Sequence, residues 1–150
     1  MTPAIPHTTD CWVVQTWTEV DGTQTTARSS EPLNAAFILQ AIAELPRCAD
    51  AGQASRLLAN QLQAWLGCRQ VAIGLCRGGR RQCKIGGLSG VGRFDKHSSF
   101  VRAVQDALNE AVVRDTETQW PSASDQQRHS SRAHETLASL LGAEYVFSVP

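Results

Sequence analysis

The chain has 150 residues, of which 42% are hydrophobic and 19% charged, and its formal net charge is zero. A chain of this length can bury about two-thirds of its unfolded surface, so it can form one globular domain without cross-links. Zero net charge provides no overall attraction to nucleic acid or to an anionic membrane. Nucleic acid is therefore not among the expected partners.

The cysteine content and the N-terminus both indicate an intracellular protein. Five cysteines are present, at Cys11, Cys48, Cys68, Cys76 and Cys83. An odd number without tight spacing fits reduced thiols better than a secreted disulfide framework. The first ten residues lack the basic and apolar regions of a signal peptide, and no apolar run is long enough to span a bilayer. We expect a cytoplasmic location.

The first thirty residues are expected to form a loose segment that precedes the main fold. Residues Trp12–Thr18 partly alternate in hydrophobicity, Asp21 and Gly22 are a turn signal, and Thr23–Arg28 can supply a partner strand. The sequence predicts a short hairpin here. The main domain then covers residues 31–150.

Two helices are predicted next. Apolar residues recur at helical spacing over Pro32–Glu44, and Pro46 disfavours helix at the residue before it. The second helix begins after Asp50, whose carboxylate can accept free N–H groups of the first turn, with Gln53 three residues on as in a capping box. Gly67 can end it in the left-handed conformation.

A β-hairpin is predicted after these helices. Its first strand covers residues 71–76, with large apolar residues on one face and small residues on the other. A Gly-rich turn over Arg77–Arg80 leads to the return strand. The alternation of the return strand places Cys83, Ile85, Gly87 and Ser89 on one face and Lys84, Gly86 and Leu88 on the other.

Four further elements complete the order. An amphipathic helix is predicted from about Ser98 to Arg114, followed by a short edge strand over Thr116–Trp120. A helix that carries Leu137 and Leu141 ends at Gly142. The last element is a strand at residues 144–150, after which no further element follows.

From about Leu33 to Pro150 this order resembles a GAF domain, which implies an α+β fold with an antiparallel sheet, helices packed on one face and a small-molecule pocket on the other. The strings VAIGL, KIGGLSGVGRFDKHSSFVRAVQDALNEAV and HETLASLLGAEYVFSVP are similar to GAF-like segments that lie N-terminal to the adaptor part of HlyD-family bacterial efflux proteins. In the family pattern further strands and a closing helix follow the strand of Tyr145. The implied fold is therefore GAF-like (profilin-like) and C-terminally incomplete.

The resemblance implies a non-catalytic sensory or regulatory module at the N-terminal end of a membrane-anchored efflux adaptor (membrane fusion protein). Its expected partners are a small-molecule ligand, the adjoining membrane-adaptor segment of the same polypeptide and a second copy bound through helices. The expected location is cytoplasmic, tethered to the inner membrane through a C-terminal part. The alternatives are a thiol-dependent methionine sulfoxide reductase of GAF fold and a dimerisation module of a signalling protein.

The candidate ligand-binding residues are Arg93, Asp95 and His97. They lie at a strand-to-helix junction, where charged side chains and free N–H groups at the start of a helix can act together. The other interpretation is that Asp95 caps the helix and Arg93 is solvated. The surrounding segment is locally basic, with one acid, Asp95, among Arg69, Arg77, Arg80, Arg81, Lys84, Arg93, Lys96 and Arg102.

Cys76 and Cys83 are the candidate redox residues of the thiol-reductase alternative. They flank the hairpin turn, and the neighbouring Arg77, Arg80 and Arg81 favour a thiolate. The other interpretation is that both are small apolar residues of a half-buried strand.

Three other functional motifs are only partly matched by the sequence. The string from Gly87 to Val91 lacks the final glycine of a nucleophile elbow, and Asp95 occupies the place of the last glycine of a dinucleotide-binding motif. His129 and His134 are one residue off the spacing of a helical zinc pair. We therefore expect neither a catalytic residue nor a metal or other cofactor.

Overall fold

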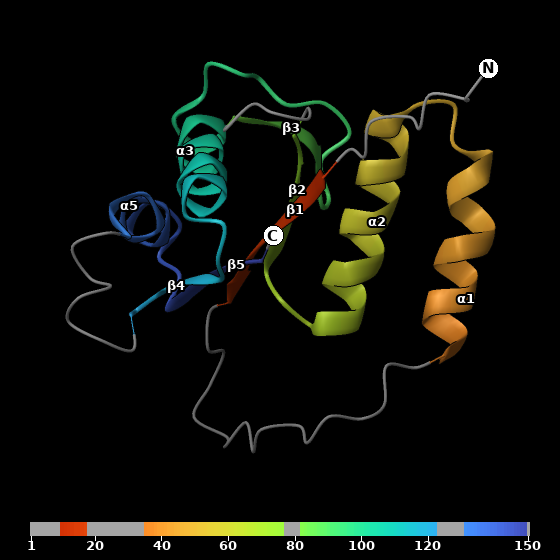
Figure 1. The fold of residues 1–150 in the computed structure, drawn as a ribbon, viewed down its shortest axis with the longest axis horizontal. Coiled ribbons are helices and arrows are strands. Elements are labelled where there is room, and N and C mark those ends of the chain that lie inside the picture. Colours follow the sequence, from red (N-terminus) through yellow and green to blue (C-terminus); the bar gives the residue numbers. More distant parts are fainter. Residues whose placement is uncertain (1–9, 18–34, 77–81, 123–130, 150) are drawn as a thin grey trace, which may run out of the picture.

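The computed structural model describes residues 10–17, 35–76, 82–122 and 131–149, and these form the predicted mixture of helices and antiparallel strands (Figure 1). The α+β class is confirmed. The elements are β1 (Asp10–Trp17), α1 (Ala35–Glu44), the short 3-10 helix η1 (Leu45–Arg47), α2 (Ala51–Leu66), β2 (Gln70–Cys76), β3 (Cys83–Leu88), α3 (Ser99–Arg114), β4 (Thr118–Trp120), α5 (Arg132–Leu141) and β5 (Tyr145–Val149).

The described strands form one sheet in the order β3-β2-β1-β5-β4, and all its pairs are antiparallel. β1 lies in the middle, where Val13 pairs with Ile73 of β2 on one side and with Val149 of β5 on the other. The strand predicted near Trp12 exists, but it belongs to the main sheet, and the prediction of a hairpin preceding that sheet is corrected. Its expected partner, Thr23–Arg28, lies outside the described residues.

Helices cover both faces of the sheet, so the expectation that they pack on one face is wrong. α2 lies on one side, and α3 and α5 lie on the other (Figure 1). The alternation along β2 explains this arrangement, because Val71 and Ile73 pack against α2, whereas Ala72 and Cys76 join the cluster of α3 and α5. A strand that is apolar on both faces can hold a helix on each.

Asp50 and Gly67 cap α2 as predicted, whereas Gln53 bonds to Ala49, one residue before the position that a capping box uses. The Asp50 carboxylate accepts a hydrogen bond from the Gln53 backbone N–H at 2.7 Å, and the Gln53 side-chain oxygen accepts one from the Ala49 N–H at 2.6 Å. The helix ends at Gly67, which is left-handed with φ of 64°. Both ends are thus fixed by residues whose chemistry the sequence displays.

β3 contains an irregularity that the alternation of its sequence does not reveal. Ile73 pairs with Gly87, but the next residue of β2, Gly74, pairs with Ile85, so Gly86 is an extra residue in β3. One inserted residue reverses the alternation beyond it. Leu88 therefore lies in the same cluster as Cys83 and Ile85, and its predicted place on the opposite face is wrong.

Glycines on the two hairpin strands allow close approach from both sides. A Cβ atom on Gly87 would lie 2.5 Å from the backbone nitrogen of Arg56 in α2. On the other face, a Cβ atom on Gly74 would lie 2.9 Å from the Leu108 side chain of α3. The glycines of this hairpin therefore serve helix packing, as their small size indicates.

α1 lies outside α2, away from the sheet (Figure 1). The rings of Phe37 and Trp65 stack with their centroids 5.5 Å apart, and the Gln61 amide donates to the Glu44 carboxylate at 2.8 Å. Leu39 and Ile42 are exposed on α1. Among the described residues, none of the helices has the length and apolar content that crossing a membrane requires.

The last predicted elements are also present. β4 is the edge strand beyond β5, and α5 ends at Gly142 with φ of 58°. The turn predicted over Arg77–Arg80 lies outside the described residues. Among the described strands, β3 and β4 are the edges of the sheet, and the candidate site lies beside β3.

Candidate functional site

A cavity of about 560 Å³ lies where α3 crosses beside β3, and we refer to it as the α3–β3 cavity. Its wall comes from the edge strand, the loop before α3 and the first half of that helix. The lining residues are Lys84, Ile85, Phe94, Lys96, Val101, Arg102, Gln105 and Asp106. Sites for small molecules commonly enclose roughly 300–1,000 Å³, so this volume is of the right size.

The start of α3 sets the helical part of the wall. The Ser98 hydroxyl accepts a hydrogen bond from the Val101 N–H at 3.3 Å and so caps the helix. Residues one turn apart then share a face, which brings Val101 and Gln105 to the cavity together. The interpretation of Asp95 as the helix cap is wrong, because its carboxylate instead accepts the His97 N–H at 2.9 Å within the loop.

The three predicted ligand-binding residues lie on the loop beside the cavity. Arg93, Asp95 and His97 are all exposed, and none of them is among the residues that line it. Their neighbours Phe94 and Lys96 are lining residues. The predicted segment therefore does reach the cavity, but the residues that line it are the ones between the predicted residues.

The electrostatic character of the cavity is positive. Lys84, Lys96 and Arg102 supply cationic groups, and Asp106 supplies the acidic group of the wall. Apolar surface comes from the half-buried Ile85, Phe94 and from the buried Val101. An organic anion with a flat or apolar body matches both kinds of surface, because its charge meets the cations while its body displaces water from the apolar wall.

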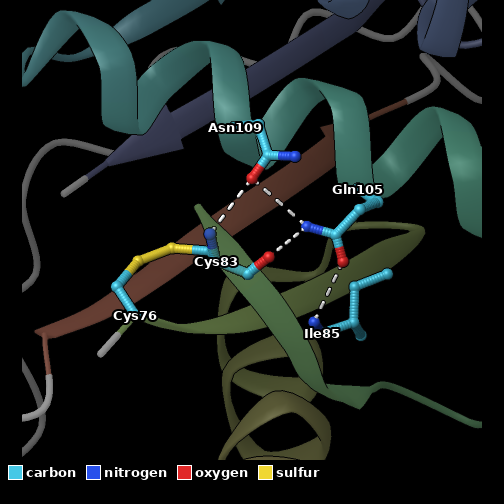
Figure 2. The surroundings of a disulfide bond; sticks show 5 residues. All are labelled: Cys76, Cys83, Ile85, Gln105 and Asn109. Carbon is cyan, nitrogen blue, oxygen red and sulfur yellow. Dashed lines mark hydrogen bonds between the residues drawn. A yellow bond between two sulfur atoms is a disulfide. The ribbon is translucent and has the colours of Figure 1, made fainter. Parts of the chain in front are cut away.

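The side-chain amides of two α3 residues form hydrogen bonds with backbone groups at the outer edge of β3 (Figure 2). The Cys83 N–H donates to the Asn109 side-chain oxygen at 3.0 Å, and the Cys83 carbonyl accepts from the Gln105 side-chain nitrogen. The side-chain oxygen of Gln105 also accepts from the Ile85 N–H at 3.3 Å. None of the described strands pairs with the outer edge of β3. Gln105 bonds to peptide groups at that edge and joins it to the cavity wall.

Cys76 and Cys83 are joined by a disulfide bond across β2 and β3 (Figure 2). They are directly opposite in the strand pair, and both are buried on the α3 side of the sheet. The expectation of reduced thiols is therefore corrected for this pair. Cys48 and Cys68 are free, and burial raises the pKa of the Cys68 thiol against smaller lowering by backbone hydrogen bonds.

A buried polar network links α3, α5 and β5. The Glu110 carboxylate lies 2.6 Å from His134 Nδ1, and Ser148 Oγ lies 2.7 Å from His134 Nε2. The same carboxylate accepts the backbone N–H groups of Ala133 and His134 at the start of α5, where the side chain of the N-cap residue Ser131 makes no capping bond. Glu110 therefore caps α5 from a neighbouring helix.

This network has the order of a Ser-His-Glu triad, but its burial favours a structural role. His134 is 0% and Ser148 is 1% exposed. A catalytic serine must reach its substrate, whereas a sealed and fully hydrogen-bonded network fixes the packing of the core. Burial would raise the pKa of Glu110, but the hydrogen bonds and charge of His134 and the capped N–H groups outweigh it and lower that pKa.

The sequence shows little sign of this network, because Glu110, His134 and Ser148 share no motif. No protein-family model, curated protein or solved structure matches this chain. Within the described ranges, no group of three or more His, Cys, Asp or Glu residues is placed to hold a metal ion. The α3–β3 cavity offers space and positive charge for a ligand within the described fold.

Proposed function

We propose that this chain is a non-catalytic sensory or regulatory module with a GAF-like fold, and that it binds a small organic anion in the α3–β3 cavity. The observation that carries the proposal is the cavity wall, which combines the cations Lys84, Lys96 and Arg102 with apolar side chains. The antiparallel sheet and the resemblance of the element order to GAF domains support the sensory part.

Binding at this place can be transmitted because the cavity wall joins two elements. Lys84 and Ile85 belong to the edge strand, and Gln105 belongs to the helix that covers it. A ligand that contacts both elements favours one relative position of strand and helix. If an adjoining segment or partner prefers that same position, the two binding free energies are coupled.

The wider context of the proposal is a bacterial efflux adaptor. In it, the membrane anchor and the adaptor hairpin follow residue 150 in a longer polypeptide, and the module lies on the cytoplasmic side. The coding sequence downstream of codon 150 tests this context. A membrane span followed by a lipoyl-like adaptor segment is expected, and a stop codon would contradict it.

The ligand class is tested with two dyes of nearly the same shape, anionic 8-anilinonaphthalene-1-sulfonate and uncharged N-phenyl-1-naphthylamine. We expect the sulfonate to bind more tightly to the folded chain. The substitutions Lys96→Gln and Arg102→Gln should each lower the affinity for the sulfonate about twofold to fivefold, as expected for partly exposed charge pairs. The affinity for the uncharged dye should not change.

The matched control is Arg47→Gln, which removes an exposed cation from η1, outside the cavity lining. Its sulfonate affinity should equal that of the parent chain. Circular dichroism checks that each variant is folded, because both dyes also bind loosened apolar cores. Equal affinity for the two dyes, or equal loss in the control and the cavity variants, would contradict an anion site.

The disulfide favours a second candidate function, a thiol-dependent methionine sulfoxide reductase. Cys76 and Cys83 are placed to close a disulfide after attack on an oxidised substrate, although they are only 4% and 3% exposed. Reduction of free methionine sulfoxide with dithiothreitol as electron donor tests it. Turnover that is lost in both Cys76→Ser and Cys83→Ser would favour the enzyme, and no turnover in the parent chain would remove it.

A further inference from the structure

The cysteine pair occupies a special kind of position in the sheet. Cys76 is the last residue of β2 and Cys83 is the first residue of β3, and they face each other with their Cα atoms 4.2 Å apart. The N–H and C=O of Cys83 both bond to α3 and so point away from Cys76. The pair is therefore a non-hydrogen-bonded one, in which Cα atoms lie about 4.5 Å apart and side chains come closest.

This position suits both oxidation states. The separation of the two backbones is the ordinary one for such a strand pair, so two thiols can also face each other here without a change of register. The pair shares its cluster with Ala72 of β2 and Leu108 of α3, so its packing against the helix involves side chains other than the two sulfurs. We therefore expect the bond to open and close within the folded protein.

The pair is also connected to the α3–β3 cavity by direct bonds. Gln105 holds the carbonyl of Cys83 with one end of its amide and the N–H of Ile85 with the other. Gln105 and Ile85 both line the cavity, and Lys84 between the two bonded positions supplies one of its cations. A shift of Cys83 thus reaches the wall of the cavity through a single side chain.

We propose that Cys76 and Cys83 form a reversible dithiol–disulfide site, reduced by dithiols and reoxidised by disulfides, whose state sets the affinity of the α3–β3 cavity for anions. The redox part stands on the cysteine geometry, whereas the coupling rests on the proposed function of the cavity. The site acts as a regulatory switch and needs no catalytic turnover.

The chemistry is thiol–disulfide exchange. A thiolate of the dithiol attacks one sulfur of the pair, forms a mixed disulfide and releases the other cysteine as a thiolate, which takes up a proton. The second thiol of the reductant then attacks the mixed disulfide and releases the remaining cysteine as a thiolate, which also takes up a proton. The reductant leaves as a cyclic disulfide. Two electrons and two protons have moved from the reductant to the pair, and a disulfide oxidant reverses every step.

The redox part is tested by equilibrating the full chain in mixtures of reduced and oxidised dithiothreitol, followed by alkylation and peptide mass analysis. We expect Cys76 and Cys83 to become alkylated together as the reduced fraction rises and to be protected again on reoxidation, with unchanged circular dichroism. The alkylation of Cys48 and Cys68 should not depend on the ratio of reduced to oxidised dithiothreitol. The redox site would be overturned if both cysteines were alkylated at every ratio of reduced to oxidised dithiothreitol, or if the chain unfolded on reduction.

The coupling is tested with the anionic sulfonate dye on the same chain in its two states. We expect dye affinities that differ by about fivefold or more, the usual range of coupled sites. The difference should persist in Cys48→Ser, the matched control, and vanish in Cys76→Ser/Cys83→Ser. Because the unaltered chain supplies both states, the test holds even if the double variant fails to fold.

The outcomes separate the two proposals. Equal dye affinity in the two states would overturn the coupling and leave the anion site intact. Absence of dye binding in both states would overturn the proposed cavity function and the coupling with it. In that case the alkylation result still decides whether the pair is a redox site.

Discussion

The amide of Gln105 connects the edge of the sheet to the helix that covers it. It bonds to Cys83 and Ile85 at the edge of β3 and lines the cavity. The sequence places Gln105 one turn from Val101 on an amphipathic helix, and this spacing alone does not distinguish it from a solvated residue. Its role depends on where the edge strand lies, which is a property of the folded sheet.

Replacing Gln105→Leu should lower the free energy of unfolding by about 1–3 kcal/mol, because the carbonyl of Cys83 and the N–H of Ile85 lose their partner. Urea unfolding monitored by circular dichroism measures the change. The neighbouring exposed Asp106→Ala should change it by less than about 0.5 kcal/mol. An equally small effect at both positions would show that the edge does not need the amide.

The network of Glu110, His134 and Ser148 gives a dependence on pH. The folded state lowers the pKa of Glu110 below its ordinary value of 4.5. A lowered pKa means that the ionised carboxylate stabilises the fold; the contribution is complete above about pH 4.5 and is lost as the pH falls through the folded value.

We expect Glu110→Gln to cost about 1.5–3 kcal/mol at pH 7, the range for hydrogen bonds to a charged group. The gap to the parent chain should stay constant above about pH 4.5 and shrink as the pH falls from there toward about 3, because the folded pKa lies below 4.5. Urea unfolding at each pH gives the two curves. A gap that stays constant as the pH falls through this lower range would contradict the assigned role of the charge.

At the scale of elements, the β2–β3 hairpin shows what periodicity can and cannot predict. The alternation of β2 correctly separates a bulky face from a small one, and the two faces pack against different helices. The same reasoning fails beyond Gly86, because an inserted residue reverses the faces without changing the composition. A bulge at a pair of glycines has no signal in hydrophobicity.

Two glycines, Gly87 in β3 and Gly92 in the loop that follows, test the packing on α2. Gly87→Ala should destabilise the chain by roughly 1–3 kcal/mol, since its Cβ would lie 2.5 Å from the Arg56 nitrogen and the helix must move. Gly92→Ala should be neutral or stabilising, because nothing lies within 4 Å of its Cβ. Thermal unfolding compares them. Similar melting temperatures would contradict the close contact.

Across the molecule, the ends of α2 and α5 are predictable from local signals, whereas the pairing of distant strands is not. Caps such as Asp50 and Gly67, and the last residues of α5, are fixed by chemistry within a few positions. The place of β1 in the middle of the sheet depends on partners far along the chain, Val71 and Val149 among others. Pairing of that kind leaves no local pattern, so the sequence predicts a separate hairpin for this strand.

The candidate site was predicted in the same partial way. The segment that contains Arg93, Asp95 and His97 does border the cavity, but Phe94 and Lys96 are the residues that line it. Composition identifies a charged strand-to-helix junction, whereas the direction of each side chain depends on the loop that Asp95 and Ser98 shape. The sequence marks Cys76 and Cys83 as flanking one turn and predicts reduced thiols, whereas the register of the strand pair brings the two into a disulfide.

The central claim is that the α3–β3 cavity binds a small organic anion. The most direct measurement is a titration of the ¹⁵N-labelled chain with 8-anilinonaphthalene-1-sulfonate, followed by amide chemical shifts. Saturable shifts should concentrate at Lys84 and Ile85, around Phe94 and Lys96, and along α3 from Val101 to Asp106. Shifts centred instead on the exposed apolar residues Leu39 and Ile42 of α1 would contradict the claim.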